Sequence, residues 1–121
     1  MPYAVRVVEG PGHLEAELTG ELTLDDLQAV RLESRELLRA HGLARIVVDA
    51  SRSTPTQSPT DDYLFTSEHK SVFGAGVRVA VAHRPEIAEH LRFIENVAQN
   101  RGFDMRVFGD RAEALAWLLA S

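Results

Sequence analysis

The sequence contains no cysteine, and this absence excludes several kinds of site. Without thiols, the chain has no disulfide framework, no thiolate zinc site and no cysteine nucleophile. It also has no apolar segment of the roughly 20 residues that cross a membrane. No basic stretch followed by an apolar run marks a signal peptide at its start. We therefore expect a cytoplasmic protein with no membrane span.

Long runs of one charge are missing as well. The 13 Lys and Arg residues are interspersed with 18 Asp and Glu residues, and the formal net charge is -5. A nucleic-acid-binding surface needs clustered basic residues, so we expect no nucleic-acid partner. The 121 residues, of which 45% are hydrophobic, suffice for one domain over residues 1–121 with a core of its own.

The order of apolar patterns predicts an α/β fold. Strands over residues 3–9 and 13–19 should form an antiparallel hairpin around a turn at residues 10–12. A continuous apolar run at residues 46–48 is typical of a parallel strand that is covered on both faces, and a further buried strand is predicted at residues 77–82. A short last strand is predicted at residues 105–108.

Four helices are expected between and after these strands. Residues suited to helix ends mark several of their boundaries: Thr23, Gly42, Ser58, Gly102 and Asp110. The predicted order is β-β-α-β-α-β-α-β-α. It describes a mostly parallel five-stranded sheet with an antiparallel N-terminal hairpin at one edge.

Three stretches carry a resemblance to a known family: GELTLDDLQAV at residues 20–30, RIVVDAS at residues 45–51 and RVFGDRAEALAWL at residues 106–118. Together they resemble the STAS-like family, also described as SpoIIAA-like (STAS/SEC14), over nearly the whole chain. The resemblance implies this fold and non-enzymatic work, either protein–protein switching or binding of apolar small molecules. We therefore predict no catalytic residue, metal or cofactor.

The resemblance also suggests a phosphorylation candidate. The family's anti-sigma-factor antagonists carry an Asp-Ser-Ser-Gly run at the start of the helix after the central strand, where a serine is phosphorylated. This chain has TQSPTD at residues 56–61 in that region. Ser58 is the nearest positional match, so a phosphorylation-controlled switch is one hypothesis.

The stretch after the third strand is rich in hydroxyl groups. We expect the strand to stop at Asp49 and a loop to continue to Ser58, and functional groups gather beyond the carboxyl ends of parallel strands. A helix N-terminus favours an anion, so we predict an anion or ligand site from Asp49, Ser51, Arg52, Ser53, Thr54, Ser58 and His83. The alternative is that Ser58 only caps the helix, that Asp49 bonds loop amides, and that the rest is solvated.

Consecutive apolar residues at positions 63–65 cannot all face one core from a short helix. We predict an interaction surface that consists of Tyr63, Phe65, Phe73 and Phe93. The alternative places Leu64 in the core and leaves the others partly exposed.

Two hypotheses about function stay open. One is a regulatory interaction module that forms a homodimer or binds a regulatory protein. The other is a carrier or sensor of a small apolar or anionic ligand held between these helices and the sheet.

Overall fold

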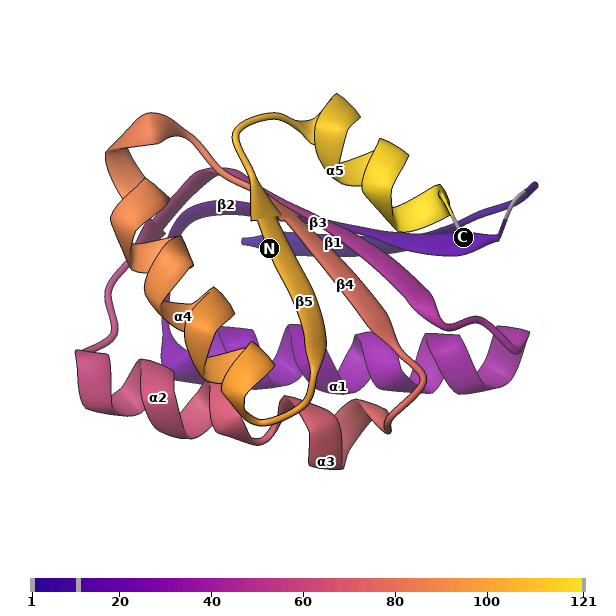
Figure 1. The fold of residues 1–121 in the computed structure, drawn as a ribbon, viewed down its shortest axis with the longest axis horizontal. Coiled ribbons are helices and arrows are strands. Elements are labelled where there is room, and N and C mark those ends of the chain that lie inside the picture. Colours follow the sequence, from indigo (N-terminus) through magenta and orange to yellow (C-terminus); the bar gives the residue numbers. More distant parts are fainter. Residues whose placement is uncertain (1, 11, 121) are drawn as a thin grey trace.

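The computed structural model describes residues 2–10 and 12–120. Its elements in chain order are β1 (Tyr3–Val8), β2 (His13–Leu22), α1 (Leu24–His41), β3 (Arg45–Pro55), α2 (Pro59–Ser67), α3 (His69–Phe73), β4 (Arg78–Ala82), the 3-10 turn η1 (Pro85–Ile87), α4 (Ala88–Asn100), β5 (Asp104–Phe108) and α5 (Arg111–Leu119) (Figure 1). The turn predicted at residues 10–12 includes residue 11, which lies outside the described residues.

The strands form one five-stranded sheet in the order β1-β2-β3-β4-β5. β1 runs antiparallel to β2, and every other neighbouring pair is parallel. The predicted mixed sheet with a hairpin at its edge is thereby confirmed. Parallel neighbours need a crossover connection, which explains why helical segments separate β2, β3, β4 and β5 along the chain.

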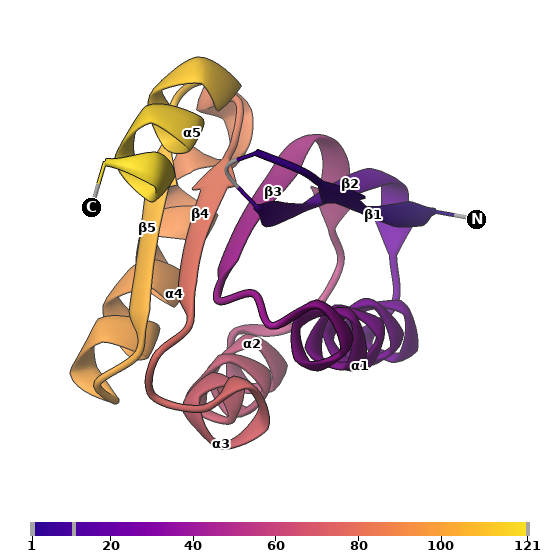
Figure 2. The ribbon, with the colours of Figure 1, turned by 90° about the vertical axis from the view of Figure 1, so that its right-hand side faces the viewer.

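The helices cover both faces of the sheet (Figure 2). α5 packs on one face, where Val47 and Ala80 meet Leu118. The other helices cover the opposite face, where Ile46 and Val79 belong to the larger core. Successive residues of a strand point to opposite faces, so a strand covered on both sides has a continuous apolar sequence. None of the described helices is long and apolar enough to cross a membrane.

The helix ends follow the capping signals of the sequence. Thr23 Oγ1 accepts a hydrogen bond from the Asp26 amide at 3.1 Å, and the Asp26 carboxylate accepts one from the Thr23 amide at 3.0 Å. This reciprocal pair satisfies two amides that the first turn of α1 leaves free. Gly42 ends α1 with φ 64°, a left-handed conformation that glycine adopts without steric cost. Asp110 accepts from the amide of Glu113 at 2.7 Å and starts α5.

The third strand is longer than predicted. It does not stop at Asp49 but continues to Pro55, alongside a β2 that continues to Leu22. A register shift between Glu17 and Thr19 precedes this second stretch of pairing. Backbone pairing with β2 holds this extension in place. Because its side chains are mostly polar, the apolar pattern of the sequence did not predict it.

Arg84 supports this extension from the segment before α4. Its Nη1 donates to the carbonyl oxygens of Ser51 at 2.9 Å and Ser53 at 2.6 Å. A charged donor forms stronger hydrogen bonds than a neutral one. Arg84 therefore ties the end of β3 to the connection between β4 and α4.

Candidate functional site

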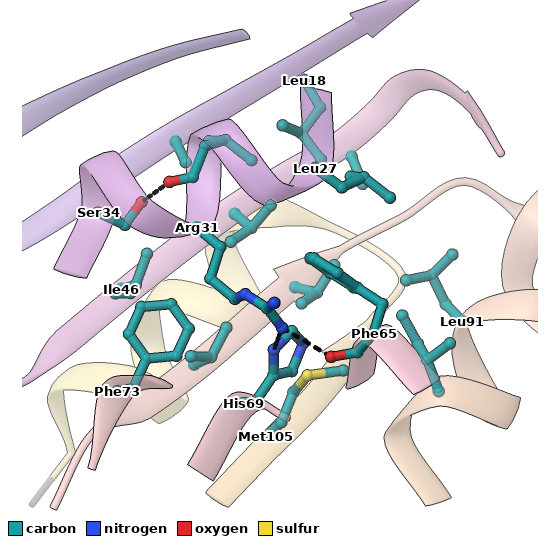
Figure 3. Close-up of a pocket in the computed structure, with 17 residues that line it drawn as sticks. Leu18, Leu27, Arg31, Ser34, Ile46, Phe65, His69, Phe73, Leu91 and Met105 are labelled. Carbon is teal, nitrogen blue, oxygen red and sulfur yellow. Dashed lines mark hydrogen bonds between the residues drawn. The ribbon is translucent and has the colours of Figure 1, made fainter. Parts of the chain in front are cut away.

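An apolar cavity of about 140 Å³ lies between the sheet and the helices on its larger face (Figure 3). Residues from four strands and four helices line it: Ala16, Leu18, Leu27, Val30, Arg31, Ser34, Ile46, Val48, Ala50, Phe65, His69, Phe73, Val79, Val81, Leu91, Ile94 and Met105. The Ser34 hydroxyl already donates to the Val30 carbonyl at 2.7 Å. The polar character of the lining therefore comes mainly from Arg31 and His69.

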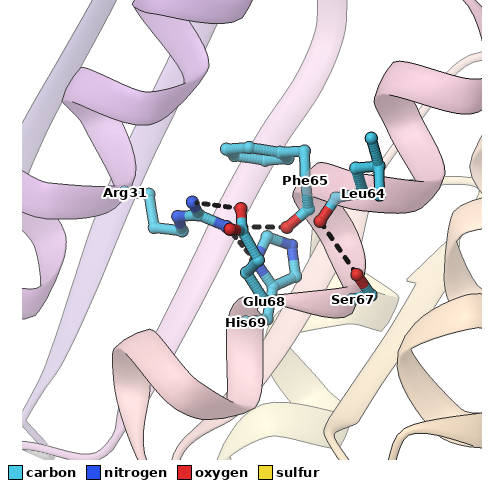
Figure 4. Close-up of polar contacts among 6 residues, drawn as sticks. All are labelled: Arg31, Leu64, Phe65, Ser67, Glu68 and His69. Atoms are coloured by element: carbon cyan, nitrogen blue, oxygen red, sulfur yellow. Dashed lines mark hydrogen bonds and ion pairs between the residues drawn. The ribbon is translucent and has the colours of Figure 1, made fainter.

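Arg31 joins α1 to the junction between α2 and α3 (Figure 4). Its Nη1 donates to the Phe65 carbonyl at 2.7 Å, and its Nη2 donates to Glu68 Oε1 at 3.2 Å. The guanidinium carbon also lies 4.0 Å from the centroid of the Phe65 ring. Carbonyls in the last turn of a helix lack helical partners, so Arg31 satisfies the end of α2 while it lines the cavity.

His69 is held as a neutral hydrogen-bond acceptor toward Arg31. Its Nδ1 lies 3.3 Å from Arg31 Nη1, and a guanidinium can only donate, so the ring proton belongs on Nε2. The ring packs edge-on against Phe65, with centroids 5.1 Å apart, and lies 5.6 Å from the Phe103 ring. Burial, followed by the charge of Arg31, lowers the pKa of His69 to about 3. The imidazole is therefore uncharged at neutral pH.

Two polar contacts attach α2 to α4 beside the cavity. His90 Nε2 lies 3.4 Å from Asp62 Oδ2, and the Asp62 side chain is 7% exposed. Burial raises the pKa of Asp62, while the charge of His90 opposes this shift and that of Asp61 adds to it. Arg101 Nη2 donates to the Tyr63 hydroxyl at 2.5 Å. These contacts position the helix that presents Phe65 to the cavity.

The predicted anion-binding residues mostly serve the backbone. Asp49 accepts hydrogen bonds from the Ser51 amide at 3.0 Å and the Ser51 hydroxyl at 2.6 Å. Ser53 is buried, and its hydroxyl donates to the Ala50 carbonyl at 2.8 Å. Ser51 and Ser53 belong to β3, so the prediction that the strand stops at Asp49 and a loop follows is wrong at these positions.

The other members of that set make contacts of their own or are exposed. Arg52 and Thr54 are exposed on β3, and Ser58 caps α2 by accepting from the Asp61 amide at 3.1 Å. Among the described residues, no hydrogen bond or ion pair connects Asp49 with His83, whose Nδ1 lies 3.3 Å from the Arg84 carbonyl. Within residues 2–10 and 12–120, no cluster of three or more His, Asp or Glu side chains could hold a metal ion.

The predicted aromatic surface divides into two groups. Tyr63 is 40% exposed and Phe93 is 41% exposed, as a surface role requires. Phe65 and Phe73 are half-buried and line the cavity. Leu64 is 55% exposed and does not lie in the core. The buried positions of α2 are the polar residues Asp62 and Thr66, which a search for apolar periodicity does not find.

A family model for SpoIIAA-like proteins matches residues 13–119. The chain belongs to the SpoIIAA-like family. No curated protein matches it.

Two solved structures share the fold of this SpoIIAA-like protein. An uncharacterised protein with a SpoIIAA-like fold from Shewanella loihica PV-4 aligns with a TM-score of 0.64 at 20% identity, over 96% of this chain and 93% of that one. An anti-sigma factor antagonist from Mycobacterium paratuberculosis aligns with a TM-score of 0.65 at 12% identity, over the same shares of the two chains. At these identities the likeness concerns the fold.

Sequence patterns could have identified the polar residues of the cavity. Arg31 lies four positions after Leu27 and next to Val30, on the apolar stripe of α1, where a charge is unexpected. Phe65, His69 and Phe73 recur at intervals of four, as residues on one helical face do. Neither signal lies in the hydroxyl-rich stretch between Asp49 and Ser58.

Proposed function

We propose that this SpoIIAA-like protein is a non-enzymatic regulatory module that binds a small, largely apolar ligand in the cavity between the sheet and α1–α4. The observation that carries the proposal is an apolar cavity with Arg31 and His69 in its lining. Binding sites for small molecules are typically concave and apolar, with a few polar groups that orient the ligand.

The size of the cavity limits the ligand. An apolar cavity of about 150 Å³ remains dry and binds a molecule as large as benzene. The cavity here, at about 140 Å³, suits a body of that size. Because the lining comes from α1, α2, α3, α4 and the sheet, an occupied cavity would connect all the elements on this face. A ligand could thus alter the surface that a protein partner contacts.

Native mass spectrometry of freshly purified protein, beside the same sample denatured, tests the proposal. We expect excess mass that disappears on denaturation. Ala50→Leu places a larger side chain at a lining position and should remove the excess mass, whereas Ala116→Leu on the exposed side of α5 should retain it. A wild-type protein without excess mass, and without a thermal shift on addition of benzene or indole, would argue against a binding cavity.

Self-association is a second candidate, supported by exposed apolar side chains on two helices that pack against each other. Tyr63, Leu64 and Phe93 are each 40% exposed or more on α2 and α4. Exposed apolar groups that cluster favour a protein contact. We expect light scattering to give a dimer for the wild type and a monomer for Leu64→Glu and Phe93→Glu. Leu32→Glu on α1 is the matched control, because Leu32 is also exposed. A monomeric wild type would exclude this use.

A further inference from the structure

The charge in the cavity lining is positive and comes from Arg31. Among the described residues that line the cavity, only Arg31 has a full charge at neutral pH, and its side chain is 10% exposed. His69 is neutral there, and no Asp or Glu of residues 2–10 and 12–120 lines the cavity. A buried positive charge needs a partner, because burial removes most of its hydration. The lining therefore favours a ligand that brings negative charge to Arg31.

The hydrogen-bonding capacity of Arg31 is not exhausted. Its described contacts use Nη1 toward Phe65 and His69, and Nη2 toward Glu68. A guanidinium carries more N–H groups than these contacts need, and Nε has no hydrogen-bond partner among the described residues. The planar arrangement of guanidinium donors matches the two oxygens of a carboxylate.

The Glu68 carboxylate already forms an ion pair with the Arg31 guanidinium. Glu68 Oε1 lies 3.2 Å from Nη2, which is long for a charge-assisted hydrogen bond, and the Glu68 side chain is 58% exposed. Ion pairs with an exposed partner contribute little, because water solvates that partner equally well when the pair is broken. Figure 4 shows Glu68 beside the guanidinium, on the segment that connects α2 and α3. This contact is replaceable.

We infer that the cavity binds a small monocarboxylate, whose apolar body fills the space beneath α1–α4 and whose carboxylate replaces Glu68 on Arg31. The inference rests on the proposed function and specifies its ligand class. The cavity of about 140 Å³ restricts the body to a phenyl ring or a short alkyl chain, as in benzoate or hexanoate. Glu68 acts in the empty protein as an internal competitor for the guanidinium.

Calorimetric titration of the full chain with benzoate and hexanoate, beside the neutral benzamide and hexanamide, tests this inference. In the wild type each carboxylate should bind about tenfold more tightly than its amide, since one charge-assisted hydrogen bond accounts for such a ratio. Glu68→Gln should strengthen carboxylate binding by about threefold to tenfold and leave amide binding unchanged. Arg31→Met should abolish the preference for the carboxylate.

The controls separate this inference from the proposed function. Glu33→Gln removes an exposed charge two positions from Arg31 and should leave both affinities at their wild-type values. Because Glu68 is exposed, Glu68→Gln tests the inference even if Arg31→Met does not fold. Amides that bind as tightly as the carboxylates, or Glu68→Gln without effect on carboxylate binding, would overturn the inference and leave a cavity for neutral ligands. If neither class binds, the inference fails, and native mass spectrometry decides the proposed function separately.

Discussion

Arg31 Nη1 lies 3.3 Å from His69 Nδ1, so a permanently charged donor faces an imidazole that must accept. This contact connects α1 with α3 and fixes the tautomer of His69. Protonation of His69 would place two positive charges side by side in a region with little water. The chain therefore contains a half-buried histidine that folding keeps neutral.

We expect this histidine to make stability depend on pH. Its pKa is about 3 in the folded chain against 6.5 for an unperturbed imidazole, so the unfolded chain binds the extra proton between these values. Stability therefore falls as the pH drops below 6.5, and at pH 5 the loss from His69 amounts to about 2 kcal/mol. Urea unfolding at pH 7 and pH 5 should show this loss in the wild type, and His69→Phe should lack that part of it.

His41→Asn provides the matched control, because it removes an exposed histidine at the end of α1. This variant should keep the wild-type difference between pH 7 and pH 5. If His69→Phe loses as much stability as the wild type over the same interval, His69 is protonated in the folded chain, and the described packing around it is wrong.

A second prediction concerns Arg84 and the end of β3. Arg84→Met removes the donor to the Ser51 and Ser53 carbonyls and should lower the free energy of unfolding by about 1–3 kcal/mol. Hydrogen exchange should accelerate at the amides of residues 52–54 more than in the first half of β3. Arg92→Met replaces an exposed arginine on α4 and should change neither quantity. Unchanged exchange in Arg84→Met would mean that pairing with β2 alone holds the extension.

The order of the strands and helices could be predicted because the capping residues and apolar runs that mark them each indicate one kind of local structure. Thr23 and Asp26 form a capping box, and Gly42 ends α1, so the limits of this helix follow from local chemistry alone. The continuous apolar run at Ile46 and Val47 requires cover on both faces, which the two layers of helices supply. These features depend on residues close together in the chain.

The cavity could not be predicted in the same way, because it depends on contacts between distant segments. Arg31 meets Phe65 and Glu68 across more than thirty positions of the chain. α2 also buries Asp62 and exposes Leu64, which reverses the usual pattern. That reversal is possible because Asp62 meets His90 on α4. Local periodicity does not contain this information.

Ser58 supplies a third prediction. Ser58→Ala should destabilise the chain by about 1 kcal/mol, because the hydroxyl accepts from the Asp61 amide at the start of α2. Ser58→Asp should retain most of the stability, since aspartate is also a good N-cap. Thr60→Ala, on the exposed side of the same first turn, is the control. Ser58 remains our candidate for phosphorylation, which a phosphate on its peptide, absent in Ser58→Ala, would demonstrate.

The fourth prediction concerns Glu15, a buried carboxylate on β2. Arg6 Nη2 donates to its Oε1 at 2.6 Å, and Arg111 Nη2 pairs with its Oε2, so Glu15 links β1 to the start of α5. Burial acts to raise the pKa of Glu15, but the hydrogen bonds from Arg6 and Arg111 prevail and hold the pKa below its usual range. The stability that Glu15 contributes is therefore present above the unperturbed value of 4.5 and is lost as the pH falls below it.

Glu15→Gln should accordingly lower the melting temperature at pH 7, because both arginines lose an ionised partner and a neutral amide makes weaker hydrogen bonds. The gap to the wild type should narrow as the pH falls below 4.5, where the wild-type carboxyl also becomes protonated. Glu17→Gln, two positions along the same strand, is the matched control, since Glu17 is exposed and should tolerate the change at both pH values. Calorimetry at pH 7 and pH 3.5 measures both gaps. A Glu15→Gln gap that stays constant with pH would show that shape and packing, rather than charge, connect Glu15 to α5.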